Sequence, residues 1–136
     1  MDIAVNLQEP VFSSHSGTIT GIERKFGPTE YAKNSYGNYV EVSFNVGNDK
    51  WKLLFGHLGE ISPELEVGKS ISAGVFIGTG GLSGNAGYKN GEPQSGMVPH
   101  VHIRGRENGK STDPAKVLNT KFNKSNGQAT NNPCGF

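Results

Sequence analysis

Residues 40–55 read Val-Glu-Val-Ser-Phe-Asn-Val-Gly-Asn-Asp-Lys-Trp-Lys-Leu-Leu-Phe, and they decide the fold class. Apolar and polar residues alternate from Val40 to Val46, a period of two that is typical of a half-buried β-strand. Gly47-Asn48-Asp49 then supplies turn residues, and a second apolar segment starts at Trp51. Two such segments joined by a short turn containing glycine predict a β-hairpin.

On the second strand of this hairpin, every second residue from Trp51 to His57 shares one face. Two explanations for His57 are open. Either this face is the core and His57 emerges at the end of the strand, or a bulge at the Phe55-Gly56 step directs His57 elsewhere. Because Trp51 shares its face with apolar residues, we expect it in the core, which disfavours a carbohydrate-binding β-domain that would use this tryptophan.

Shorter patterns extend the all-β prediction along the chain. Many glycines and prolines indicate short strands joined by turns. Strands are expected at 10–12, with its partner at 17–22, at 71–77 as two pieces hinged near Gly74, and at 100–104. Segments 26–37 and 78–98 are expected to be loops, and Asp113-Pro114 opens a short helix that reaches about residue 119.

Length and composition limit the functional classes. A chain of 136 residues with a net charge of +1 forms one domain and has no electrostatic signature of a nucleic-acid-binding protein. We expect the folded domain to span 1–120 and a polar tail to span 121–136. The single Cys134 excludes an internal disulfide. No membrane span and no targeting signal are recognised in this chain.

Pro99-His100-Val101-His102-Ile103 is the strongest indication of function. In a β-strand, His100 and His102 point to the same face while their apolar neighbours point to the other. This arrangement favours a metal or catalytic site by about two to one over a structural role, in contrast to an isolated histidine such as His15 in its serine-rich turn, which we expect to be solvated. Asp2 is a possible carboxylate ligand, although a carboxylate at a chain end is ordinarily just solvated.

Other enzyme classes lack their motifs: Gly78-Thr79-Gly80-Gly81 is not followed by the lysine of a P-loop, and no Gly-X-Ser-X-Gly motif is present.

Several segments, taken in order, resemble the lysostaphin/LytM-type zinc metallopeptidases, which cleave peptide bonds in bacterial peptidoglycan. The segments that carry the resemblance are Asp2-Ile3-Ala4, Pro10-Val11, Tyr36-Gly37-Asn38-Tyr39-Val40, Phe55-Gly56-His57-Leu58, Val67 to Gly78, Pro99 to Ile103 and Asp113-Pro114. The similarity runs from Asp2 to about Leu118. Each piece alone is modest, whereas the ordered set is specific.

The resemblance implies a fold, a cofactor and roles. The implied fold is all-β, with a central antiparallel sheet in a barrel-like sandwich. Asp2 and His102 are implied as ligands of Zn²⁺, and His57 and His100 as the catalytic groups beside the zinc-bound water. Tyr36 is implied to hydrogen-bond the reaction intermediate. The substrate would be a peptidoglycan peptide, at an extracellular or cell-envelope location or in a phage particle.

One position of the family pattern is not supplied. The family's first zinc ligand is a histidine four residues before the aspartate, a position that falls ahead of Met1. Two explanations follow: the sequence is cut from a longer protein, or the metal site is degenerate. The second corresponds to a non-catalytic relative that binds cell-wall peptide or a protein partner. The segment 82–98 is longer than the family pattern, and we expect it beside the cleft.

Overall fold

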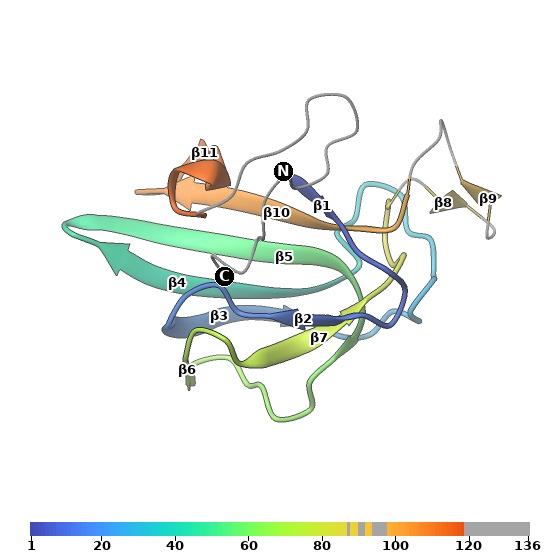
Figure 1. Cartoon of the computed structure of the whole chain (residues 1–136), viewed down its shortest axis with the longest axis horizontal. Helices are drawn as coiled ribbons and strands as arrows, with labels where there is room; N and C mark the ends of the chain where they lie inside the picture. The colour runs from blue at the N-terminus through green and yellow to red at the C-terminus, as the bar shows by residue number, and fades with distance from the viewer. Residues whose placement is uncertain (87, 90–91, 94–97, 119–136) are drawn as a thin grey trace.

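The computed structural model describes residues 1–86, 88–89, 92–93 and 98–118, and in these residues the protein is an all-β domain (Figure 1). Nine strands form one antiparallel sheet, and two more form a small hairpin. The strands are β1 (Asp2–Ala4), β2 (Pro10–Phe12), β3 (Gly17–Glu23), β4 (Asn38–Val46), β5 (Asp49–Ile61), β6 (Ser70–Ile71), β7 (Phe76–Gly80), β8 (Tyr88–Lys89), β9 (Glu92–Pro93), β10 (His100–Glu107) and β11 (Lys110–Thr112). The predicted all-β antiparallel fold is confirmed, and within the described residues the sheet does not close into a barrel.

The central hairpin of β4 and β5 forms where the alternating pattern predicted it. Val42 lies opposite Leu53 and Phe44 opposite Trp51, so the apolar faces of both strands coincide. These side chains are buried in one hydrophobic core, and Trp51 is only 1% exposed. Trp51 is therefore a core residue and not a sugar-stacking surface. Burial of so many large apolar side chains is the main favourable contribution to the stability of this domain.

Strand β5 bends halfway along its length. Its first half pairs with β4 and β10, and its last residues pair with β7. The register with β4 shifts between Asn38 and Val40, which lie opposite Leu58 and Phe55. Two residues of β5 therefore stand against one of β4, which is the β-bulge that was one of the two explanations for His57, and His57 itself has a positive φ of 60°. The bulge removes His57 from the face that it would otherwise share with Phe55.

One predicted strand pairing was wrong. The strand at 10–12 was expected to pair with the segment 17–22 across the intervening turn, but β2 pairs with β7. Strand β3 pairs instead with β4 and, at its start, with β6. The two short strands predicted in 71–77 exist as β6 and the beginning of β7, on either side of Gly74. The pairing of β2 with β7 brings together segments more than sixty residues apart, which no local pattern encodes.

The edges of the sheet are formed by short strands. Strand β1 pairs with β10 on one side, and β11 pairs with the far end of β10. The expected helix after Asp113 is a single 3₁₀ turn, Pro114–Lys116, which Asp113 caps by accepting a hydrogen bond from the Ala115 backbone N–H. The predicted tail and Cys134 lie outside the described residues. In the part of the chain that the structure describes, no helix has the length and apolar character to cross a membrane.

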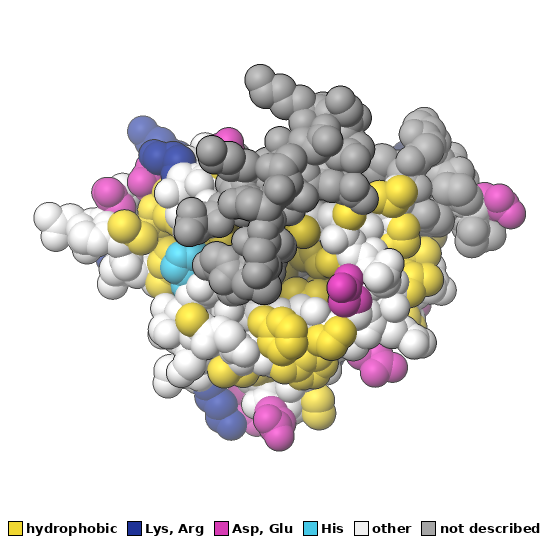
Figure 2. All heavy atoms as spheres, viewed as in Figure 1, with side chains coloured by type: hydrophobic (Ala, Val, Ile, Leu, Met, Phe, Trp, Pro, Cys, Tyr) yellow, Lys and Arg dark blue, Asp and Glu magenta, His cyan; other side chains and the backbone are white. Residues whose placement is uncertain are grey.

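Apolar side chains are exposed on one outer face of the domain. Figure 2 shows hydrophobic side chains gathered over β2 and β7. Phe12 on β2, Phe76 on β7 and Val75 just before β7 are each at least 40% exposed. The rings of Phe12 and Phe76 contact each other edge to face, with their centroids 6.3 Å apart. This face is separate from the histidine cluster described next, none of whose residues lies on β2 or β7.

Candidate active site

The paired histidines lie on β10 beside the edge strand β1. His102 is the direct cross-strand partner of Asp2, and His100 is the partner of Ala4. Val101 and Ile103 point to the opposite side and are buried in the core, as the alternation predicted. The two histidines therefore face one groove because the apolar residues between and after them anchor the other face of β10.

His57 enters the same groove from the bulge on β5. Its backbone N–H donates to the carbonyl of Tyr36 at 2.7 Å, and its Nδ1 lies 2.8 Å from the carbonyl oxygen of Ser83. A carbonyl oxygen only accepts, so Nδ1 carries the proton and Nε2 is left as the acceptor. Burial lowers the pKa of His57 to about 4, although the hydrogen bond to Ser83 acts in the opposite direction. At neutral pH, His57 is thus an uncharged imidazole in a fixed tautomer.

A buried polar network holds the loop that carries this carbonyl. The Ser83 hydroxyl donates to the carbonyl of Leu58 at 2.6 Å and accepts from the Asn38 backbone N–H at 2.9 Å. The Asn38 side chain in turn donates to the carbonyls of Phe26 and Gly59 and accepts from the Phe26 N–H. Asn38 and Ser83 are almost completely buried. Each hydrogen-bonding group of this network has a partner, so the network fixes the loop rather than destabilising it.

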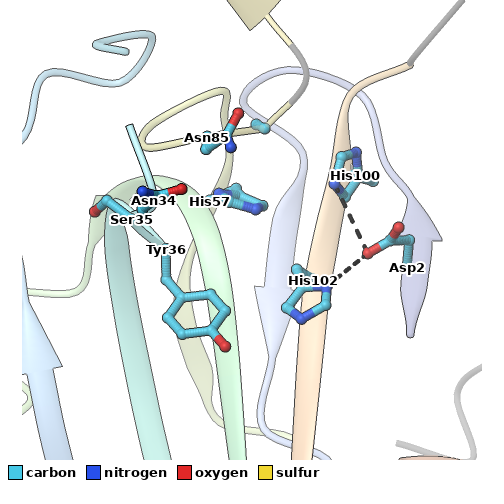
Figure 3. A pocket seen from close by; sticks show the side chains of 9 residues that line it. Asp2, Asn34, Ser35, Tyr36, His57, Asn85, His100 and His102 are labelled. Carbon is cyan, nitrogen blue, oxygen red and sulfur yellow. Dashed lines mark hydrogen bonds and ion pairs between the residues drawn. The ribbon is translucent and has the colours of Figure 1, made fainter. Parts of the chain in front are cut away.

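Asp2 joins the two histidines of β10. Its Oδ1 lies 2.7 Å from His102 Nδ1 and 3.8 Å from His100 Nε2 (Figure 3). The hydrogen bond from His102 lowers the pKa of the Asp2 carboxyl, against the opposing effect of partial burial. His100 Nδ1 donates to the Val98 carbonyl at 2.9 Å, which leaves His100 Nε2 directed toward Asp2 and the groove.

Tyr36 and a polar loop complete the walls of the groove. The Tyr36 ring stacks on His102 with centroids 5.5 Å apart, and the His57 ring lies 5.4 Å from His100 and 6.0 Å from His102. The groove has a volume of about 440 Å³ and is open to solvent on one side. Its lining residues are Asp2, Asn34, Ser35, Tyr36, His57, Asn85, Ala86, His100 and His102.

The structure therefore brings the five residues singled out from the sequence, Asp2, Tyr36, His57, His100 and His102, into one groove. His15 is not among them. It was expected to be solvated, but it is partly buried and stacks on Phe44 with ring centroids 4.0 Å apart. Sequence reasoning missed the amide and hydroxyl side chains Asn34, Ser35 and Asn85, which lie on irregular loops without a periodic pattern.

The donor chemistry of the groove suits zinc, but the number of donors falls short. Zinc prefers imidazole nitrogen and carboxylate oxygen, and its protein sites use at least three such ligands. Within the described residues, no group of three or more histidine, cysteine, aspartate or glutamate side chains is arranged to hold a metal ion. Asp2 and His102 instead contact each other directly. These residues supply a pair of suitable donors and not a complete zinc site.

Comparison with known proteins gives a consistent picture. The sequence model of peptidase family M23 matches residues 1–114. The catalytic domain of the antimicrobial peptidase lysostaphin from Staphylococcus simulans superposes with a TM-score of 0.55 at 23% identity, over 85% of this chain and 74% of that one. Helicobacter pylori Csd3 gives 0.57 at 22% identity, over 83% of this chain and 24% of that one.

A zinc-containing peptidase from Vibrio cholerae gives a TM-score of 0.54 at 23% identity, over 82% of this chain and 28% of that one. The chain thus spans about a quarter of the length of Csd3 and of the Vibrio protein. At these identities the likeness establishes the fold. No curated protein sequence matches the chain.

Proposed function

This chain belongs to peptidase family M23, and we propose from that premise that its groove hydrolyses peptide bonds in the peptide part of bacterial peptidoglycan. The observation that supports the proposal is the convergence of three imidazoles and one carboxylate from β1, β5 and β10 around one open groove. A groove of about 440 Å³ that is open on one side can admit an extended peptide. A protein acting on this substrate works outside the cell, in the cell envelope or in a phage particle.

His57 and His100 are the proposed catalytic groups. Both hold their Nδ1 proton on a backbone carbonyl, so both present Nε2 to the groove. The pKa of His57, lowered to about 4 by burial, keeps its Nε2 unprotonated and able to take a proton from an attacking water. Tyr36 is the proposed hydrogen-bond donor to the oxyanion that forms on the substrate carbonyl.

Asp2 and His102 are the proposed protein ligands of a zinc ion. His102 Nδ1 and the Asp2 carboxylate already face each other. Together they would hold the zinc ion, which would supply Lewis-acid chemistry to the substrate carbonyl. A site of three protein ligands requires one donor beyond this pair. That requirement makes the zinc content of the purified chain the first measurement to make.

Digestion of purified peptidoglycan tests the proposal. We expect release of soluble fragments with new amino termini in the presence of zinc, loss of release with a chelator, and loss in His102→Ala. His15→Gln is the matched control, because it removes a histidine that lies outside the groove. A chain that carries stoichiometric zinc and releases no fragments from peptidoglycans with different cross-bridges contradicts the proposal.

A second candidate function is favoured by the incomplete donor set. With two protein donors, zinc affinity is low, and the groove would then bind a cell-wall peptide or a protein partner without cutting it. Co-sedimentation with peptidoglycan separates the two functions. Binding without zinc and without release of fragments supports the second candidate, whereas zinc-dependent release supports the first.

A further inference from the structure

The groove continues past the histidine cluster along the solvent-facing side of β10. A second hollow of about 460 Å³ shares Tyr36 and His102 with the first and extends to Arg104 and Ser111. Because alternate residues of a strand share a face, the side chains of His102, Arg104 and Arg106 point to the same side of the sheet. An extended ligand that leaves the histidine cluster along β10 therefore passes Arg104 and then Arg106.

Arg104 is held in a fixed position beside the groove. Its Nη2 lies 3.1 Å from Glu41 Oε2, and Glu41 Oε1 accepts from the Thr20 hydroxyl. The guanidinium lies over the Tyr36 ring at 5.3 Å, while its Nε is buried and has no hydrogen-bond partner within the described residues. The Glu41 carboxylate offsets the charge of Arg104, so this arginine mainly shapes the groove and supplies spare donors.

The next cross-strand row of the sheet, which contains Arg106 and Lys52, carries positive charge without a counter-charge among the described residues. Arg106 on β10 lies directly opposite Lys52 on β5, and both side chains are exposed. Neither forms an ion pair in the part of the chain that the structure describes. Like charges directly opposite each other on neighbouring strands are destabilising. Their neighbours in the same row are the hydroxyl residues Ser111, opposite Arg106, and Ser43, opposite Lys52.

Within the residues that the structure describes, few carboxylates face this row. Glu41 is bound to Arg104 as described, and the Asp113 carboxylate lines the same hollow but caps the 3₁₀ turn through the Ala115 N–H. Among the described residues, the charges of Lys52 and Arg106 thus have no counter-charge, and both side chains are exposed on the sheet face that adjoins the histidine cluster. An anionic ligand group would relieve the repulsion between the two side chains, with hydroxyl donors available on both sides.

We propose that Lys52 and Arg106 form a subsite that binds a carboxylate of the peptide substrate, together with Arg104, which lies two residues nearer to His102 on β10. Successive side chains on one face of β10 are two residues apart, and this spacing corresponds to about 7 Å along the strand. The subsite therefore lies roughly 7 to 13 Å from His102, the distance spanned by two to four extended peptide residues. A peptide with a free carboxylate at that distance from the scissile bond is the preferred substrate class. This inference rests on the proposed function, because it takes the groove to be a peptide site.

Binding of matched synthetic peptides tests the subsite without requiring hydrolysis. One peptide carries a glutamate and a free terminal carboxylate, and its partner carries glutamine and a terminal amide. We expect the unaltered chain to bind the acidic peptide more tightly in calorimetry, with the difference shrinking as salt is raised. Lys52→Gln and Arg106→Gln should each weaken binding of the acidic peptide by about fivefold and leave the neutral peptide unaffected. Amide chemical-shift changes should concentrate on β5 and β10.

Lys110→Gln is the matched control. Lys110 is also exposed and lies on the adjacent strand β11, but its partner is Glu107, whose side chain belongs to the opposite face of β10. Equal affinity for both peptides, or equal weakening by Lys110→Gln, overturns the subsite. Tighter binding of a poly(glycerol phosphate) with the same dependence on Lys52 and Arg106 also overturns it, in favour of a phosphate polymer.

The two proposals fail in different ways. If the chain binds the acidic peptide through Lys52 and Arg106 but cuts no peptidoglycan, the proposed hydrolysis is contradicted and the proposed subsite is supported. If the chain cuts acidic and neutral substrates equally well, the proposed hydrolysis is supported and the proposed subsite is contradicted.

Discussion

His57 Nδ1 lies 2.8 Å from the carbonyl oxygen of Ser83, twenty-six positions further along the chain. This one contact joins the bulge of β5 to the loop that follows β7. It fixes the tautomer of His57, and it depends on Ser83 being held by its hydroxyl against Leu58 and Asn38. The chemistry available at the groove is therefore tied to a buried network whose residues do not line the groove.

The pKa of His57 predicts a loss of stability in mild acid. Its pKa is about 4 in the folded protein and about 6.5 in an unfolded chain. Above pH 6.5 both states are uncharged and the residue contributes nothing; as the pH falls from 6.5 toward 4, only the unfolded state takes up a proton. The free energy of unfolding should therefore decrease over that range by roughly 3 kcal/mol.

Urea denaturation followed by the fluorescence of the single tryptophan measures this change, in the presence of a chelator so that no metal holds the imidazole. His57→Asn is the matched variant, because asparagine tolerates the positive φ of this position better than other non-glycine residues. The difference in unfolding free energy between pH 7.5 and pH 4.5 should be smaller in the variant. An unchanged difference would show that His57 is not the group responsible.

Asn38→Asp should strongly destabilise the protein, although the two side chains have nearly the same shape. The carboxylate cannot donate to the carbonyls of Phe26 and Gly59, and it brings charge into a site that is 1% exposed. We expect a loss of about 3 kcal/mol or more in unfolding free energy. Asn45→Asp, at an exposed position of the same strand, should change it by less than about 0.5 kcal/mol. Similar losses in both variants would contradict the role given to the buried network.

Two glycines with similar positive φ values should respond differently to alanine. Gly37 and Gly47 have φ values of 65° and 60°, which are unfavourable for alanine in both cases. A Cβ at Gly47 meets open space, whereas one at Gly37 would overlap the backbone and hydroxyl of Ser83. Gly47→Ala should cost about 1 kcal/mol, and Gly37→Ala about 3 kcal/mol or more. Thermal unfolding of the two variants side by side measures the difference, and equal melting temperatures would contradict it.

The sequence predicted those parts of the fold that a local period encodes. The alternation of Val40, Val42 and Phe44 against Leu53 and Trp51 predicted the central hairpin and its buried face, and the spacing of the β10 histidines predicted their common direction. Strands β1 and β11 were not predicted: unlike the equally short strand at 10–12, neither Asp-Ile-Ala nor Lys-Ser-Thr is an apolar run followed by a turn signal. The partner of β2 was predicted wrongly because pairing between distant segments depends on the whole sheet.

The sequence singled out residues that share one groove, but it did not predict how they are arranged there. The ordered motifs singled out Asp2, His57, His100 and His102, but they left the direction of His57 open, because it depends on the bulge in β5. The roles of Ser83 and Asn38 depend on contacts between loops, for which the sequence carries no spacing rule. The same holds for the positive row of Lys52 and Arg106, since the register of β5 against β10 places them opposite each other.

The contact between Asp2 and His102 leads us to expect that the affinity for zinc depends on the Asp2 carboxylate. The lowered pKa keeps the Asp2 carboxyl ionised well into the acidic range, so a negative oxygen is available beside His102 at any physiological pH. Asp2→Asn removes this charge and should weaken zinc binding by about 100-fold, measured by competition with a coloured chelator. Because a proton lies between the two donors, zinc affinity of the unaltered chain should also fall as the pH is lowered. Asp49→Asn, an exposed carboxylate remote from the groove, should leave the affinity unchanged. If the unaltered chain and Asp2→Asn bind zinc equally weakly, then the pair does not form a metal site, and the groove acts as a peptide-binding site without metal.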